Sequence, residues 1–266
     1  MDAYSGVKGL IFMNNIVFHL SGSTAALRCA AQYLADRGYT ISTEPSHAVT
    51  HLLLPVPSFD PDGIIKGGGH IENTLKLLPE NVTVIGGNLQ NPALSTKNCI
   101  DLLLDPLYLA ENAAITADCA IRIAGNNLPV VFDGCPILVI GWGRIGKCLA
   151  CKLKAMDADV TVAARKDTDR ATAQSLGFHV RDTAKLNLGL SHYRVIFNTV
   201  PSLVLDAAQT ALCRKDCIMI DLASKQGIFS DAMIWARGLP NRDAPESSGI
   251  LIARSVLRIL SGKEDL

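Results

Sequence analysis

The sequence predicts an α/β protein of two domains, each with a parallel sheet between helices. Three observations predict this class. Short apolar stretches alternate with helical patterns along most of the chain, and a glycine-rich turn, Gly141 to Gly146, joins an apolar stretch to a helix. The tail, residues 247–260, has apolar residues in helical spacing, so we expect a last helix that crosses back onto the first domain.

The first half predicts a flavodoxin-like parallel α/β domain. A helix over residues 24–37, closed by Gly38, follows the first strand. A long loop rich in proline and glycine, residues 55–69, follows the third strand, where ligands bind in open α/β sheets. Strands are expected at residues 15–20, 39–42, 51–56 and 82–86.

The second half predicts a second domain of the same class. A connecting helix over 113–126 is expected to begin near Thr116, with Asp118 in its first turn. The expected boundaries are 1–115 for a substrate or partner domain, 116–246 for the connecting helix and second domain, and 247–266 for the returning helix. Strands of the second domain are expected at residues 137–140, 160–163, 195–198 and 217–221.

The glycine-rich turn predicts a Rossmann NAD(P)-binding domain. The first glycine permits a tight turn, the second lets the backbone approach a pyrophosphate, and the third lets helix and strand pack closely. Phosphates then lie at a helix N-terminus, where N–H groups and the helix dipole favour negative charge. The expected cofactor-binding residues here are Gly141, Gly143, Arg144, Ile145 and Gly146.

The end of the next strand favours NADP(H) over NAD(H). An NAD enzyme usually has Asp or Glu at this place, whereas this chain has Ala164, Arg165 and Lys166. Arginine can hold a 2′-phosphate with two hydrogen bonds, and Arg170 adds positive charge. The alternative is that Arg165 and Lys166 are solvated loop charges. Thr199, Val200 and Pro201, after the following strand, complete the expected cofactor site.

Composition argues against several other classes. Lys and Arg (25) balance Asp and Glu (25), and charged residues make up only 19%, which favours neither a nucleic acid nor a membrane surface as partner. Residues 9–13 are apolar but lack a basic leader, so we interpret them as no signal peptide. The eight cysteines then indicate reduced thiols in a cytoplasmic protein. Cys148 and Cys151, and Cys213 and Cys217, are expected to pack inside helices and to bind no metal.

These motifs together resemble a known family, the A subunit of dipicolinate synthase. The likeness covers nearly all of the second domain and is thinner in the first, where it rests on residues 54–57 and 116–120. The matching stretches of the second domain are residues 139–146, 161–165, 197–201, 220–225, 238–240, 244–245 and 248–251.

The resemblance implies an activity, a cofactor and a partner. The family oxidises dihydrodipicolinate to dipicolinate with NADP(H) in the mother cell of a sporulating bacterium, together with a flavoprotein-like B subunit. We therefore expect an oxidoreductase that forms a heteromer or a homo-oligomer and binds a small dianionic substrate. Asp118, Gln226 and Asn241 depart from the family, which has Glu, Pro and Gly at these positions.

Strand ends suggest which residues hold this substrate. Lys225 follows the strand that ends at Asp221, so it can meet a carboxylate, and Ser224 and Thr199 are neutral donors at adjoining strand ends. Asp118 can receive the proton that aromatisation releases, and Thr116 lies beside it. The catalytic candidates are therefore Asp118 and Lys225, and the substrate-binding candidates are Thr116, Thr199, Ser224 and Lys225. Each also has an ordinary interpretation, as a solvated lysine, a turn residue or a first-turn helix charge.

Two other functions stay open. A 2-hydroxyacid dehydrogenase is disfavoured because Ser224 stands where those enzymes have Arg, and no histidine follows His192. A non-catalytic NADP(H)-binding subunit that scaffolds a redox partner is favoured only by the lack of a convincing acid–base pair.

Overall fold

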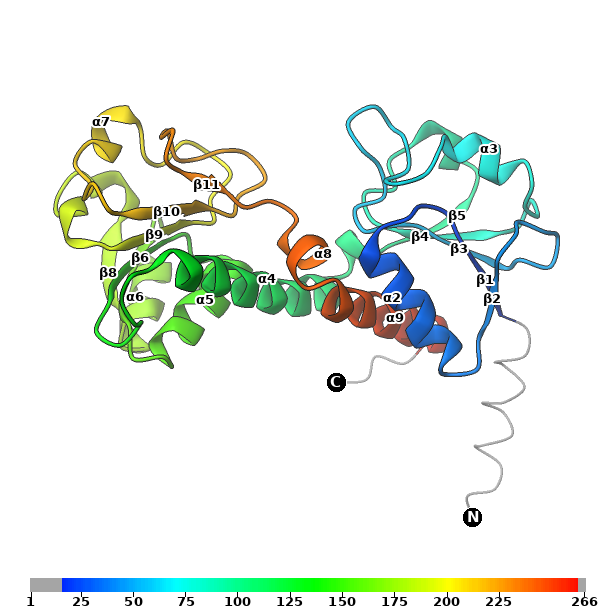
Figure 1. Ribbon diagram of the computed structural model, residues 1–266, viewed down its shortest axis with the longest axis horizontal. Helices are drawn as coiled ribbons and strands as arrows, with labels where there is room; N and C mark the ends of the chain where they lie inside the picture. Colours follow the sequence, from blue (N-terminus) through cyan, green and yellow to red (C-terminus); the bar gives the residue numbers. More distant parts are fainter. Residues whose placement is uncertain (1–15, 263–266) are drawn as a thin grey trace, which may run out of the picture. The chain divides into compact units, whose positions relative to one another are not determined.

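The chain forms two compact units, each built on one parallel sheet (Figure 1). The computed structural model describes residues 16–262, so the apolar segment 9–13 lies outside the described residues. Of the described residues, unit 1 comprises 16–112 and 240–262, and unit 2 comprises 113–239. The predicted α/β class is confirmed. Within the described residues, no helix is long and apolar enough to cross a membrane.

The sheet of unit 1 has the order β2-β1-β3-β4-β5, and all its pairings are parallel. This is the strand order 2-1-3-4-5 of flavodoxin-like domains. Its central strands are apolar and buried, as parallel sheets covered on both faces require. The strands are β1 (Val17–Leu20), β2 (Thr40–Ser42), β3 (His51–Leu53), β4 (Thr83–Gly86) and β5 (Asn98–Asp101).

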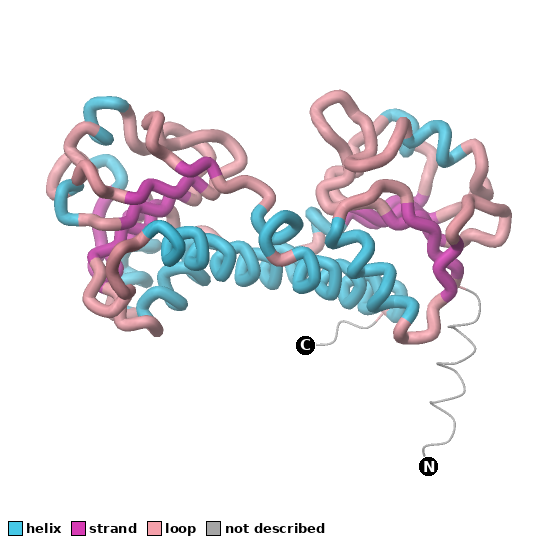
Figure 2. The backbone as a smooth tube through the Cα atoms, viewed as in Figure 1, coloured by secondary structure: helices cyan, strands magenta, loops and turns pink. Residues whose placement is uncertain are grey.

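Helices cover this sheet and include the predicted returning helix. Helix α9 packs along α2, and both bury their apolar stripe (Figures 1 and 2). Asn241, from the turn of helix before α9, donates from Nδ2 to the carbonyl of Val56 at 2.5 Å. The helices are α2 (Ala25–Ala35), α3 (Ile71–Leu75), α8 (Leu239–Asp243) and α9 (Pro245–Ser261), with short 3-10 turns η1 (Pro92–Leu94) and η2 (Leu102–Leu104).

The connecting helix begins earlier than the sequence pattern predicts. Helix α4 spans Pro106–Asn127, so its start lies about three turns before Thr116. Asp105 accepts hydrogen bonds from the amides of Leu107 (3.3 Å) and Tyr108 (3.2 Å). An Asp followed by Pro at the first helical position is a strong start signal, and it outweighs the weaker Thr116.

The sheet of unit 2 has the order β11-β10-β9-β6-β7-β8, again with parallel pairing. The chain runs outward from β6 to β8, and then returns to the other side of β6 with β9. This reversal, between β6 and β9, is the point where Rossmann domains bind dinucleotides. The strands are β6 (Pro136–Ile140), β7 (Asp159–Ala164), β8 (His179–Asp182), β9 (Val195–Asn198), β10 (Ile218–Asp221) and β11 (Ile234–Trp235).

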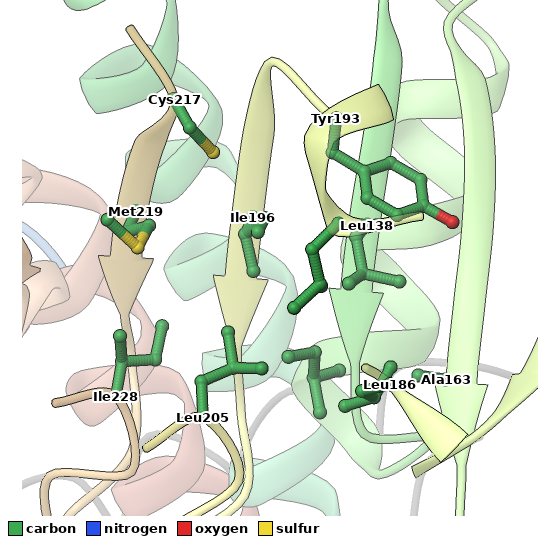
Figure 3. Close-up of a cluster of buried hydrophobic side chains, with 11 residues drawn as sticks. Leu138, Ala163, Leu186, Tyr193, Ile196, Leu205, Cys217, Met219 and Ile228 are labelled. Carbon is green, nitrogen blue, oxygen red and sulfur yellow. The ribbon is translucent and has the colours of Figure 1, made fainter. Parts of the chain in front are cut away.

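A buried apolar cluster fills one face of this sheet (Figure 3). Leu138, Ile196 and Met219 come from neighbouring strands, and Leu205 and Ile228 come from the loops beyond the carboxyl ends of β9 and β10. The cluster thereby fixes these loops to the sheet. The helices of unit 2 are α5 (Arg144–Lys154), α6 (Asp167–Ser175) and α7 (Ala207–Thr210), with 3-10 turns η3 (Thr183–Lys185) and η4 (Leu190–His192).

The cysteines differ in part from expectation. Cys148 and Cys151 lie in α5, but the buried packing expected of them is not found for Cys151, which is exposed, and Cys148 is half-buried. The expectation that Cys213 and Cys217 lie in a helix is wrong, because α7 ends at Thr210 and Cys217 immediately precedes β10. All eight thiols are free. A hydrogen bond from Cys217 lowers the pKa of the Cys213 thiol, whereas that bond and burial raise the pKa of Cys217.

Candidate dinucleotide site

The glycine turn has the close packing that its sequence predicts. Gly141 has φ +107°, a conformation that side chains rarely adopt, and a Cβ there would lie 2.2 Å from Oγ1 of Thr199. A Cβ on Gly146 would lie 2.2 Å from the carbonyl oxygen of Gly141. Strand β6 and helix α5 therefore approach each other as closely as backbone allows.

At Gly143 the backbone faces open space instead. A Cβ built there meets nothing within 4 Å, and Gly143 is the N-cap of α5 with no side-chain cap. The N–H groups at the start of α5, from Arg144 onward, therefore offer an uncovered binding site for an anion. Arg144 is exposed and Ile145 is half-buried. This arrangement fits a pyrophosphate.

A pocket of about 700 Å³ opens beside this turn. The last residues of β7, the turn η3 and the segment after β9 form the rest of its wall. Its volume is in the range of ligand pockets, and it lies at the carboxyl edge of the sheet. The lining residues are Gly141, Trp142, Gly143, Ala164, Arg165, Lys166, Asp169, Thr183, Ala184, Val200, Ser202, Leu203, Val204, Asp206 and Gln209.

The predicted basic residues lie at the rim of the pocket, together with an acidic residue that was not predicted. Arg165 and Lys166 line the pocket with exposed side chains, beside the buried Ala164. Asp169, on the first turn of α6, lines the same pocket and was missed from the sequence because it lies five residues beyond the usual acidic position. Near the end of β7 the pocket therefore has two cations and the carboxylate of Asp169, and Asp206 lines it from the segment after β9.

Arg170 has a structural role instead of the expected role as a positive charge for the cofactor. Its Nη1 donates to the carbonyls of Ala164 and Arg165, both at 2.8 Å, and its Nη2 contacts Asp167. Asp182 lies 3.6 Å from Nη1. The guanidinium group thus holds the end of β7 in shape, and two carboxylates offset its charge, so it adds little field at the rim.

The residues after β9 divide between structure and pocket. Thr199 donates from Oγ1 to the carbonyl of Ile140 at 3.0 Å, so its hydroxyl fastens β9 to the glycine turn. Val200 lines the pocket, and Pro201 is exposed next to the lining residue Ser202. Thr199 therefore supports the cofactor site, and its hydroxyl is already engaged on the donor side.

Three further residues were not predicted from the sequence. They are Trp142, which lines the pocket, and the pair Asn198 and Asp221, which lies at the strand ends without lining it. Trp142 is buried in the pocket wall against Phe178, and its indole Nε1 has no hydrogen-bond partner among the described residues. Asn198 and Asp221 end neighbouring strands, are fully buried, and are joined at 3.0 Å. Paired polar residues at two adjacent strand ends were the available signal.

The substrate candidates separate into two groups. Ser224 and Lys225 lie together in the loop after β10, with exposed side chains, although neither lines the pocket. Thr116 is buried in α4. Asp118 lies 2.8 Å from Nζ of Lys152, near the C-terminal end of α5, whereas the pocket lies at its N-terminal end. Unit 2 thus brings Ser224 and Lys225 together, but not Asp118.

A second pocket, of about 460 Å³, lies in unit 1 beyond β3 and β4. It includes part of the long loop for which the sequence predicts ligand binding. The lining residues are Phe59, Asp60, Pro61, Gly63, Asn88, Gln90 and Asn91. Since this lining has a carboxylate and amides but no basic side chain, it does not suit a dianion.

The strand orders, the glycine turn and the larger pocket define the class. The chain is a two-domain α/β protein with a Rossmann unit of the type that dehydrogenases use for nicotinamide dinucleotides.

Comparison with known proteins gives a particular likeness. The chain is 24% identical over 258 residues to the A subunit of dipicolinate synthase from Bacillus subtilis (strain 168), a match that covers 85% of this chain and 84% of that protein. The crystal structure of the corresponding A subunit from Bacillus halodurans has a TM-score of 0.79 at 22% identity, and covers 93% of this chain and 98% of that chain.

A transhydrogenase from Sinorhizobium meliloti shares the architecture, with a TM-score of 0.73 at 13% identity, and covers 98% of this chain and 88% of that chain. No family model matches the chain. The resemblance to the A subunit of dipicolinate synthase is confirmed, and the solved structures establish the fold.

Proposed function

We propose that this chain is an NADP(H)-dependent oxidoreductase that converts dihydrodipicolinate to dipicolinate together with a flavoprotein-like B subunit. The observation that carries the proposal is the pocket beside the glycine turn, with Arg165 and Lys166 on its rim, in a chain similar to the A subunit of dipicolinate synthase. A sporulating mother cell is the setting that this likeness suggests.

Different residues of unit 2 bind different parts of the cofactor. The N–H groups at the start of α5 take the pyrophosphate, and the open backbone at Gly143 lets it approach. Arg165 and Lys166 take the 2′-phosphate of NADP(H), to which Arg can donate two hydrogen bonds. Bound NADP⁺ supplies the hydride acceptor.

The proposed oxidation requires little from the protein beyond orientation of the substrate. Aromatisation of the dihydropyridine ring removes one hydride and one proton and is favourable, so holding the two carboxylates in place is the main task. Lys225, with Ser224 beside it, extends from the carboxyl edge of the sheet and provides a cation for a carboxylate. Asp118 stays outside the proposal, because its carboxylate pairs with Lys152.

Replacement of Lys225 tests the substrate assignment. Lys225→Ala should raise the apparent KM for dihydrodipicolinate by about tenfold to a hundredfold, the scale of a lost charge-assisted contact, with NADPH affinity unchanged. Lys215→Ala, at the amino end of the same strand, is the matched control and should behave as wild type. Formation of dipicolinate is followed by its ultraviolet absorbance, with and without the B subunit.

Two outcomes would contradict the proposal at different levels. Wild-type kinetics in Lys225→Ala would remove Lys225 and Ser224 from the site. If NADPH binds but no dipicolinate forms with any partner, the chain is instead a cofactor-binding subunit that scaffolds or regulates the redox protein.

A further inference from the structure

Asp221 is a buried carboxylate that the proposed chemistry does not use. It ends β10 with no exposed surface, and four N–H groups converge on its two oxygens. Oδ1 accepts from Asn198 Nδ2 (3.0 Å) and from the amide of Ala223 (3.0 Å). Oδ2 accepts from the amides of Gly227 (2.6 Å) and Ile228 (3.1 Å).

These bonds fasten the loop after β10 at both of its ends. Ala223 precedes the exposed residues 224–226, and Gly227 follows them, so one carboxylate sets where that loop leaves and rejoins the body of unit 2. An asparagine could not do the same, because it has one acceptor oxygen where Asp221 has two. One of the two pairs of N–H groups would then face an NH₂ group.

Gly227 joins this loop to the segment after β9. Its carbonyl accepts from the amides of Val204 (2.8 Å) and Leu205 (3.1 Å). A Cβ on Gly227 would lie 2.4 Å from Asn198 Nδ2 and 2.5 Å from the carbonyl oxygen of Ser202. Beyond it, Ile228 pairs with Leu205, and both side chains lie in the buried cluster of Figure 3.

That segment is a wall of the dinucleotide pocket. Ser202, Leu203, Val204 and Asp206 line the pocket, whereas Asp221 and Gly227 do not. We propose that Asp221 is a positioning residue for the cofactor: through Gly227 it holds the 202–206 wall at the distance that a bound dinucleotide needs. This inference rests on the proposed function, because it assigns the pocket to that cofactor.

A double-mutant cycle tests the pathway. Asp221→Asn and Gly227→Ala disturb the same junction from its two sides. Each variant should therefore bind the preferred cofactor, NADPH or NADH, about tenfold more weakly, which is the scale of one unsatisfied hydrogen bond. Because both act through one junction, the double variant should bind no more than about threefold more weakly than the worse single variant, whereas independent effects would multiply to about a hundredfold. Asp216→Asn, just before the amino end of β10, is the control that should bind as wild type.

Hydrogen exchange on the wild-type protein keeps the test independent of how the variants fold. Cofactor binding should slow amide exchange at Gly227 and Ile228, although neither lines the pocket. Unchanged exchange at these amides, unchanged binding by either single variant, or multiplied losses in the double variant would each overturn the role of Asp221. A wild-type protein that binds neither cofactor would instead contradict the proposed function and, with it, this inference.

Discussion

Arg165 decides the cofactor proposal at the residue scale. It lines the pocket with an exposed side chain directly after β7, where a ribose 2′-phosphate lies in Rossmann domains. Arg165→Ala should weaken NADPH binding by about 1.5–3 kcal/mol, the scale of hydrogen bonds to a charged group, and leave NADH nearly unaffected. Fluorescence titration with both cofactors measures this. NADH binding as tight as that of NADPH in the wild type would contradict the NADP(H) preference.

Asp169, on the same rim, should have the opposite effect on NADPH binding. Its carboxylate lines the pocket with Arg165 and Lys166, so it should repel a 2′-phosphate. Asp169→Asn should tighten NADPH binding by about 0.5–1 kcal/mol, the range of partly exposed charge interactions, and less at high salt. Calorimetric titration at two ionic strengths provides the measurement. Weaker NADH binding by the variant with no gain for NADPH would show that Asp169 holds the ribose hydroxyls instead.

Single residues also mark the limit of prediction from sequence. Strand ends could be located, so Thr199, Asp221 and Lys225 were all expected at the carboxyl edge of one sheet. The direction of each side chain could not be predicted, because it depends on partners far along the chain. Thr199 reaches back to Ile140, and Asp221 faces inward to residues 223–228.

At the scale of an element, substitutions at two glycines of the glycine turn can be compared with one at a control glycine in α4. Gly146→Ala should abolish measurable cofactor binding and lower the Tm, because its Cβ would lie 2.2 Å from the carbonyl of Gly141 and push α5 from β6. Gly143→Ala should keep the wild-type Tm but bind cofactor more weakly, since its methyl enters the pocket. Gly125→Ala in α4 is the control, and its higher helix propensity should add about 1 kcal/mol of stability.

Thermal unfolding and NADPH titration of the three variants separate these effects. A Gly146→Ala protein with wild-type Tm and wild-type affinity would contradict the tight approach of strand and helix.

Elements with a strong apolar pattern were predicted, and weaker ones were missed. The buried strands β6, β7, β9 and β10 were expected within one or two residues of their observed bounds. The edge strand β8, with the sequence His-Val-Arg-Asp, and the strand β5, with the sequence Asn-Cys-Ile-Asp, lack an apolar run because one side of each is exposed. Short α3 and β11 offer too few residues for any period to appear.

At the scale of the whole molecule, the two units differ in continuity. Unit 2 is one uninterrupted segment, residues 113–239, with its own sheet, core and pocket. We expect this segment, expressed alone, to fold and to bind NADPH within about tenfold of the intact chain, as a compact domain can. Energy transfer to the nicotinamide from the two tryptophans of this segment, Trp142 in the pocket wall and Trp235, measures binding.

The matched fragment, residues 1–112, should fail to fold, since it lacks α9 and leaves the buried face of α2 uncovered. A folded 1–112 fragment, or an unfolded 113–239 fragment, would show that the units depend on each other in another way.

The discontinuity of unit 1 has a consequence for biosynthesis. A ribosome makes β1 through β5 before unit 2, yet α9, the partner of α2, is translated only after the whole of unit 2. At about 5–20 residues per second, the nascent strands wait on the order of ten seconds while unit 2 is synthesised and can already fold. Through that interval the apolar face of α2 is open to chaperones, to proteases or to another nascent chain. A premature stop codon just upstream of α9 would thus cripple the part of the protein that was translated first, and spare the part translated later.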